Sequence, residues 1–215
     1  MNAGHVDTAS CNDIIEHFFG VVQDVYVYAS GSSKRMDTLR DSMSAAIQIL
    51  VQEGKVTTGR GLNQQQLLGK LSDTRWNCRI RTLKSLKKIF KSIIEVFTQE
   101  GAETQALELA SKVLTFRFAF LLHMNIQLLD CTQSLSLQCQ SSSINFITAV
   151  ALINSAKQRI KTLSSEEGFT EVLDDTLSFC KDNEIPIPEL SDLWTGENPL
   201  SSRKVSVPKK IRTCR

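Results

Sequence analysis

Apolar residues recur at helical spacing along most of this chain. The first run predicts a helix over residues 13–29, with Asn12 or Asp13 placed to cap its first turn. A SerGlySerSer segment at 30–33 interrupts the pattern, which resumes after it and continues to Gly54. We therefore expect a second helix that runs back along the first.

A third run gives the clearest periodicity in the sequence. From Trp76 to Phe97, apolar residues step by three or four positions and form one unbroken stripe, which predicts an amphipathic helix. The segment from Ala102 to about Leu129 is apolar on nearly every side in its second half. One helix is expected there, at the centre of the fold, because a helix that is apolar all round must be buried.

Two further stripes complete the pattern. The shorter one spans Phe169–Cys180. The other has Lys157 as its only charged member and consists of Ile144, Ile147, Val150, Ala151, Asn154, Lys157, Ile160 and Leu163. Since no segment reads convincingly as a strand, the predicted fold class is all-α, a bundle of about six to eight helices.

Proline and charge divide the chain into four parts. All four prolines fall in the last thirty residues, and the segment from Pro199 onward holds six cations and no acid. We expect an N-terminal extension at 1–11, a helical bundle at 12–184, a proline-containing irregular segment at 185–198 and a basic, disordered tail at 199–215. Five tail cations fit a nuclear-import signal weakly and predict a nuclear location: Arg203, Lys204, Lys209, Lys210 and Arg212.

Length and composition fit one intracellular domain. With 215 residues, 41% of them hydrophobic, the chain can fill one sizeable core. Its most apolar stretch, Val113 to Leu129, is interrupted by Arg117 and His123 and falls short of the ~20 apolar residues that a membrane span needs. The first residues lack the basic and apolar regions of a secretory signal. We therefore expect no membrane partner and an intracellular location.

The sequence contains no pattern typical of a cofactor, a metal site or a catalytic centre. Its six cysteines include no CxxC pair, and His5, Cys11 and His17 do not have the spacing of a zinc site. His123, inside an apolar run, is more typical of a core histidine than of an acid or base. Phosphate-binding glycine loops and nucleophile motifs do not occur. We expect no enzyme activity, no cofactor and no small-molecule substrate.

The third predicted helix is strongly basic. Between Thr74 and Ile94 the sequence holds no acid and seven cations: Arg75, Arg79, Arg81, Lys84, Lys87, Lys88 and Lys91. Such a helix can neutralise nucleic-acid phosphates, although the same composition also suits an ordinary solvated surface. Trp76 is in register with Ile80 and Leu83 as a core residue would be; alternatively, it stacks on an unpaired base.

At this helix the sequence resembles a known family. LeuSerAspThrArgTrpAsnCysArg, at 71–79, is similar to the ThrArgTrp motif of hAT-type transposases and of domesticated relatives such as the zinc-finger MYM-type and TTF-type transposase-derived proteins. Segments at 18–33, 115–122 and 135–140 agree with the family in the same order, and the similarity covers most of 12–190. In that family these segments form the helical insertion of an RNase-H-like catalytic fold.

The resemblance implies a domain without catalysis. The family uses three carboxylates outside the insertion to hold two metal ions, so this chain is expected to lack them and to be a truncated copy. Arg75 and Trp76 match the motif that helps to hold transposon-end DNA. We expect a catalytically inactive domain with auxiliary contact to DNA or to a full-length transposase-like relative. Two alternatives stay open: a protein-interaction scaffold for another nuclear protein, and a remnant without selected activity.

Overall fold

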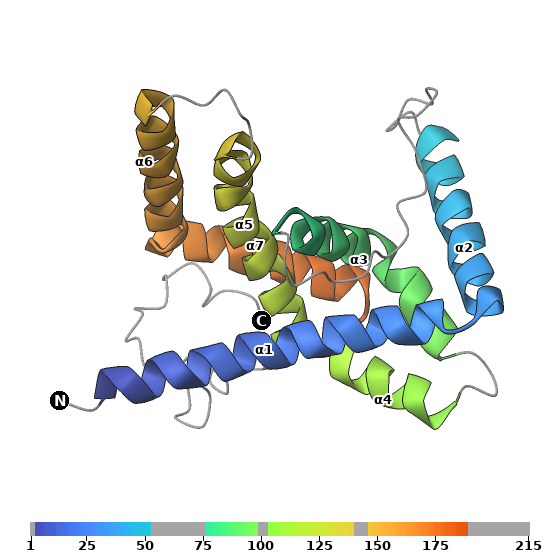
Figure 1. Cartoon of the computed structure of the whole chain (residues 1–215). Coiled ribbons are helices and arrows are strands. Elements are labelled where there is room, and N and C mark those ends of the chain that lie inside the picture. The colour runs from blue at the N-terminus through green and yellow to red at the C-terminus, as the bar shows by residue number, and fades with distance from the viewer. Residues whose placement is uncertain (1–2, 53–75, 99–102, 140–145, 189–215) are drawn as a thin grey trace, which may run out of the picture.

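The structure, a computed structural model, describes residues 3–52, 76–98, 103–139 and 146–188. Within these ranges the chain forms seven α-helices and no strand, which confirms the predicted all-α bundle (Figure 1). The helices are α1 (Ala3–Ser30), α2 (Ser33–Gln52), α3 (Trp76–Phe97), α4 (Thr104–Val113), α5 (Phe116–Cys139), α6 (Phe146–Leu163) and α7 (Glu166–Asp182).

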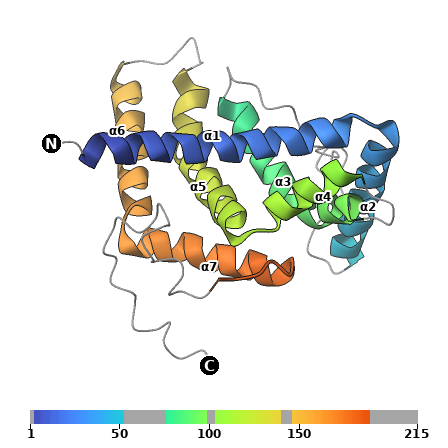
Figure 2. The ribbon, with the colours of Figure 1, turned by 90° about the horizontal axis from the view of Figure 1, so that it is seen from below.

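Helix α5 occupies the centre of the bundle, as its all-round apolar character predicts. It packs against α1, α3, α4, α6 and α7. Helix α1 runs along one side of the molecule, and α2 and α6 stand at opposite ends (Figures 1 and 2). The two end helices therefore have fewer neighbours than α5: α2 contacts α1 and α3, whereas α6 contacts α5 and α7.

A chain of aromatic side chains connects four of the helices through the core. Phe18 of α1 lies 5.2 Å from Phe118 of α5, measured between ring centroids. Phe90 of α3 lies 6.5 Å from Phe118 and 4.9 Å from Phe179 of α7. Each buried phenylalanine contributes roughly 1.5–3 kcal/mol through removal of apolar area from water, and each ring pair about 0.5–1.5 kcal/mol more. The core therefore couples α1, α3, α5 and α7 directly.

The apolar stripe predicted for α3 is confirmed. Its members after the first are at most 2% exposed: Ile80, Leu83, Leu86, Phe90, Ile93 and Phe97. The stripe is wider than predicted, because Thr82, Ser85, Ile89 and Val96 are buried as well. Helix α3 is thus covered on most of its circumference and presents only a narrow side to solvent.

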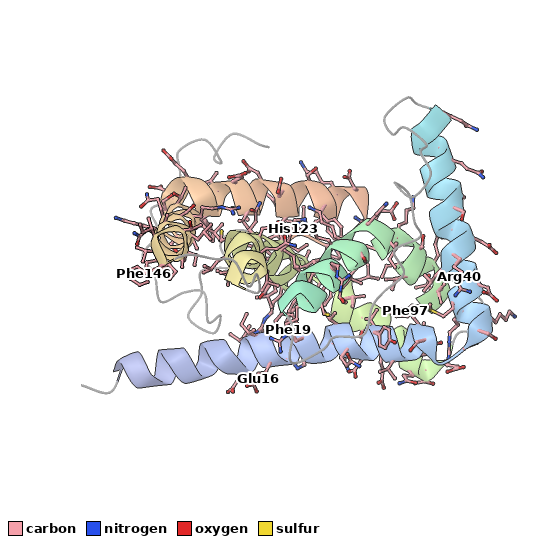
Figure 3. All side chains as sticks on the ribbon, turned by 45° about the horizontal axis from the view of Figure 1, so that its top comes forward. Glu16, Phe19, Arg40, Phe97, His123 and Phe146 are labelled. Atoms are coloured by element: carbon pink, nitrogen blue, oxygen red, sulfur yellow. The ribbon has the colours of Figure 1, made fainter. Side chains whose placement is uncertain are left out.

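The start of α1 and the direction of α2 differ from the predictions. Helix α1 begins at Ala3 and passes through Asn12 and Asp13, so neither residue caps it. Apolar residues are sparse before Ile14, so the apolar periodicity does not predict a helix there. Helix α2 leaves α1 at a steep angle instead of running back along it (Figures 1 and 3). Its contact with α3 holds it in that direction.

The single helix predicted from Ala102 to Leu129 is two helices. Helix α4 ends at Val113 and α5 begins at Phe116, with Thr115 between them. The Thr115 hydroxyl donates a hydrogen bond to the carbonyl of Lys112 (3.1 Å) and accepts one from the amide of Phe118 (3.2 Å). One side chain thereby satisfies a carbonyl at the end of α4 and an amide at the start of α5, as a cap does. The break allows α4 to pack on α1 and α3 while α5 enters the core.

Helix α6 is rotated relative to the prediction. Ile147, Val150 and Lys157 of the predicted stripe are exposed. The side that faces the bundle consists of Ala149, Leu152, Ala156, Ile160 and Leu163, of which Ala156 is buried and the others half-buried. This second set contains no polar residue, whereas the predicted stripe included Asn154 and Lys157. Burial of a purely apolar side costs no desolvation of an amide or an ammonium group, and this favours the observed rotation.

The turn between α6 and α7 is tightly packed. Ser165 caps α7, because its hydroxyl accepts a hydrogen bond from the amide of Gly168 (3.3 Å) and donates one to the carbonyl of Thr162 (2.6 Å). After α7 the chain turns at Glu184, which has a positive φ of 56°. Ile185 then returns to the core and is buried. The bundle therefore includes at least the first residue of the predicted irregular segment at 185–198.

Candidate nucleic-acid interface on helix α3

The exposed side of α3 is a straight line of cations. Arg81, Lys84, Lys88 and Lys91, here called the α3 basic line, are separated by three, four and three residues and are all exposed. This spacing places them on one side of a helix. Over ten residues the line is about 15 Å long, given a rise of 1.5 Å per residue. Glu95, one turn further, ends the line with an exposed acid.

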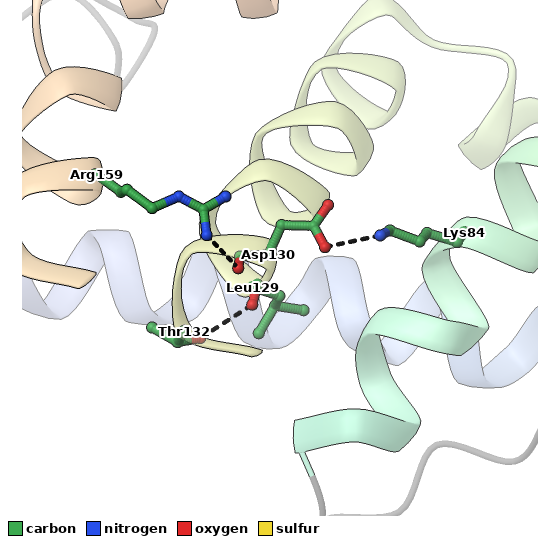
Figure 4. A network of polar contacts seen from close by, with 5 residues as sticks. All are labelled: Lys84, Leu129, Asp130, Thr132 and Arg159. Carbon is green, nitrogen blue, oxygen red and sulfur yellow. Dashed lines mark hydrogen bonds and ion pairs between the residues drawn. The ribbon is translucent and has the colours of Figure 1, made fainter. Parts of the chain in front are cut away.

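Lys84 takes part in a network that joins three helices (Figure 4). Its ammonium group lies 2.7 Å from the carboxylate of Asp130 on α5. The backbone carbonyl of Asp130 accepts a hydrogen bond of 3.2 Å from Arg159 on α6. Because the lysine and aspartate side chains are 49% and 28% exposed, solvent weakens the pair and it contributes roughly 0.2–1 kcal/mol. Lys84 is therefore partly neutralised, and its main contribution is to fix α3 against α5.

Two of the predicted cations are half-buried and lie off the line. The guanidinium group of Arg79 lies over the ring of Phe19, 4.9 Å from its centroid. This contact connects α3 to α1. Lys87 is half-buried on the side of α3 that approaches His123, and its charge acts on that histidine. Arg79 therefore has a contact within the bundle, and neither Arg79 nor Lys87 belongs to the α3 basic line.

His123 is a buried residue of α5, beside α7 (Figure 3). Its Nδ1 lies 2.8 Å from the carbonyl of Ala119, so Nδ1 carries the hydrogen and donates it. Nε2 is then an unprotonated acceptor, and it is buried without a hydrogen-bond partner. Desolvation lowers the pKa of His123 and the positive charge of Lys87 lowers it further, whereas the Ala119 hydrogen bond and Asp175 act in the opposite direction. The ring is held neutral, as in a packed core.

Several predicted site residues cannot be placed. Arg75 and the five tail cations, Arg203, Lys204, Lys209, Lys210 and Arg212, lie outside the described residues. Trp76 is the first residue of α3, but its side chain is outside the described part. The choice between a core tryptophan and a base-stacking one therefore stays a prediction.

The described ranges also bear on metals and membranes. Among their residues, no three histidine, cysteine, aspartate or glutamate side chains are grouped so that they could hold a metal ion. None of the helices in these ranges is long and apolar enough to cross a bilayer.

Sequence reasoning missed two features of the bundle. Asp130 and Arg159 were not predicted to contact α3 or each other, because their positions depend on how three helices pack. The exposed apolar residues at the start of α6 were also missed, since periodicity placed Ile147 and Val150 on the buried side. Asn154 and Lys157 within that stripe were the available signal that the side faces water.

Comparison of the chain with protein-family models, with curated proteins and with solved structures gives no match. The likeness to hAT-type transposase-derived proteins therefore rests on the sequence segments described above.

Proposed function

We propose that this protein is a non-catalytic helical domain that contacts the phosphate backbone of DNA through the α3 basic line. The observation that carries the proposal is the arrangement of Arg81, Lys84, Lys88 and Lys91 along the exposed side of a helix whose other sides are buried or half-buried. The resemblance to the helical insertion of hAT-type transposases points to the same helix. Contact with DNA is the role that both arguments favour, while transposon-like DNA is proposed from the resemblance and a nuclear location from the basic tail.

The geometry suits a few phosphate contacts. Duplex DNA carries one negative charge per about 1.7 Å of its axis, so a line about 15 Å long faces more phosphates than it has cations. The line has four cations, of which Lys84 is paired with Asp130 and Arg81 lies 3.7 Å from the sulfur of Cys78. The logarithm of the binding constant should therefore fall with the logarithm of salt concentration at a slope between about −2 and −4. Such contacts are independent of base sequence.

The test is fluorescence anisotropy of a labelled duplex titrated with the full chain at two salt concentrations. Replacement of Arg81, Lys88 and Lys91 by Glu should weaken binding at least tenfold, because it converts attraction to repulsion. The matched control replaces three exposed cations on other helices by Glu: Lys34 on α2, Lys112 on α4 and Lys181 on α7. Equal losses from both triple variants would mean that only net charge matters.

The basic tail needs its own control. Both triple variants should also be made in a chain of residues 1–198, which lacks the five cations proposed as a nuclear-import signal. Binding that disappears with the tail, in a protein with unchanged circular dichroism, would assign the DNA contact to the tail and overturn the proposal for α3.

A second function, protein interaction, is favoured by a different observation. The first half of α6 exposes large apolar side chains at one end of the molecule. This surface does not overlap with the α3 basic line, so the two proposals can fail separately.

A further inference from the structure

The start of α6 exposes four large apolar residues within eight positions. Phe146 and Ile147 are 81% and 80% exposed, and Val150 and Ile153 are 38% and 40% exposed. Phe146 lies at the outer edge of the molecule, on the opposite end from Arg40 of α2 (Figure 3). Single exposed apolar residues are ordinary, but several together on one helix side are typical of an interaction surface.

The same side becomes basic in its second half. Phe146, Val150, Ile153 and Lys157 follow one another at spacings of four, three and four, which places them on one line. Lys161, one turn further, is also exposed, and α6 contains no acid. We call these residues the α6 outer face: Phe146, Ile147, Val150, Ile153, Lys157 and Lys161.

This division of the face argues against a second copy of the chain. In an antiparallel pair of α6 helices, Lys157 and Lys161 of one copy would lie against the apolar end of the other and lose water without a partner. In a parallel pair, lysines would face lysines and repel. Neither arrangement satisfies both halves of the face.

A lipid surface fits poorly as well. Helices that lie in a membrane interface keep their lysines on the side opposite the apolar residues. Lys157 instead lies on the apolar line itself, so insertion of Phe146 and Val150 into lipid would carry this ammonium group toward the hydrocarbon.

We infer that the α6 outer face binds an amphipathic helix of a partner protein, with acidic residues at one end of that helix. Apolar anchors spaced i, i+3 or i+4, and i+7 would pack on Phe146, Val150 and Ile153. Acidic residues would pair with Lys157 and Lys161. The partner helix runs antiparallel to α6, because acids are most favourable in a first turn and the first turn then lies beside Lys161. This inference does not depend on DNA binding.

The test uses two synthetic peptides of the same length as α6, 18 residues. Both carry leucines at the anchor spacing in their C-terminal half; one has glutamates in its first two turns and the other has lysines there. In fluorescence anisotropy with the full chain, the glutamate peptide should bind about tenfold more tightly than the lysine peptide. Replacement of Lys157 and Lys161 by Glu should reverse this preference.

A matched pair of double variants tests the apolar half. Phe146→Asp with Ile147→Asp should abolish binding of the glutamate peptide. Val27→Asp with Leu107→Asp alters residues that are 51% and 52% exposed on α1 and α4, and should leave binding unchanged. The α6 double variant should leave the thermal melt unchanged, since Phe146 and Ile147 are 81% and 80% exposed, and the melt of the control variant is measured beside it to show that both variants are folded.

Three results would overturn the inference. The first is equal affinity for both peptides, or binding that survives the α6 double variant. The second is a dimer in sedimentation velocity that the α6 double variant abolishes, which would assign the face to a second copy. The third is binding to phosphatidylcholine and phosphatidylserine vesicles that depends on Phe146 and Ile147, which would assign it to lipid.

Discussion

At the scale of single residues, burial changes the acid–base chemistry of His123. It is a core residue with one ring nitrogen bonded to Ala119 and the other without a partner. Protonation of Nε2 would place a charge in the core near the ammonium group of Lys87, and the Ala119 hydrogen bond and the charge of Asp175 offset this only in part. The neutral ring is favoured for these reasons, which fits a structural role and not one in acid–base catalysis.

Stability should therefore fall when the pH falls below neutral. The pKa of His123 in the folded protein is lowered from its ordinary value of 6.5, so the unfolded chain binds more protons. The stabilisation is fully present above pH 6.5 and decreases as the pH falls toward the folded pKa, by at most about 1.4 kcal/mol per pH unit. Urea unfolding by circular dichroism at pH 7.5, 6.5 and 5.5 measures this. His123→Leu should flatten the profile, and an unchanged profile would assign the pH dependence to other groups.

At the scale of elements, the α6–α7 turn depends on one glycine. A Cβ atom at position 168 would lie 2.3 Å from the carbonyl oxygen of Thr162 and 2.7 Å from the Cα of Leu163. Both are backbone atoms of the preceding helix and turn, so neither can rotate away. Only glycine allows α7 to start this close to the end of α6.

Gly168→Ala should destabilise the protein by roughly 1–3 kcal/mol, the usual cost of an atom inserted into a packed region. Gly20→Ala is the control, because the added Cβ would meet nothing within 4 Å beyond its chain neighbours and the backbone of its own helix, and the position is an exposed part of α1. This change should stabilise by about 0.5–1 kcal/mol through helix propensity. Chemical denaturation monitored by circular dichroism gives both values. A neutral Gly168→Ala would show that the turn can open without cost.

Comparison of the elements with their predictions shows what periodicity can establish. Periodicity located α3 to the residue, because the apolar stripe from Ile80 to Phe97 lies on one side of the helix. It failed for α6, where apolar residues occur on two sides and the choice depends on which neighbours are available. It also joined α4 and α5, since Thr115 breaks the helix through two hydrogen bonds that leave the apolar pattern intact.

The candidate site was partly predictable for the same reason. The apolar stripe of α3 predicts which side of the helix is buried, and this in turn predicts which of its cations are exposed. Arg79 and Lys87 leave the exposed set because Phe19 and His123 are close to them in space, though far away in sequence. Contacts between α3, α5 and α6 through Asp130 are likewise a property of the packed bundle.

At the scale of the whole molecule, α5 packs against five of the other described helices, whereas α2 and α6 stand at opposite ends of the bundle. The amides of the described core of α5, from Phe118 to Leu129, should exchange with deuterium most slowly, because opening them requires most of the bundle to open. Amides in the last turn of α2 and the first turns of α6 should exchange faster, since within the described part of the chain each of these helices contacts only two others. Hydrogen-exchange mass spectrometry of the full chain measures this difference. Protection of α6 equal to that of α5 would contradict the prediction.

Because α6 packs on the bundle through one side, its other side can be engineered. Its inner side, Ala156 together with Leu152 and Ile160, holds the helix on α5 and α7, while its outer positions contribute little to folding. Those positions can therefore be randomised in a library, with selection for new targets and without redesign of the core. The natural helix offers a recognition surface whose sequence can change almost independently of the fold that carries it.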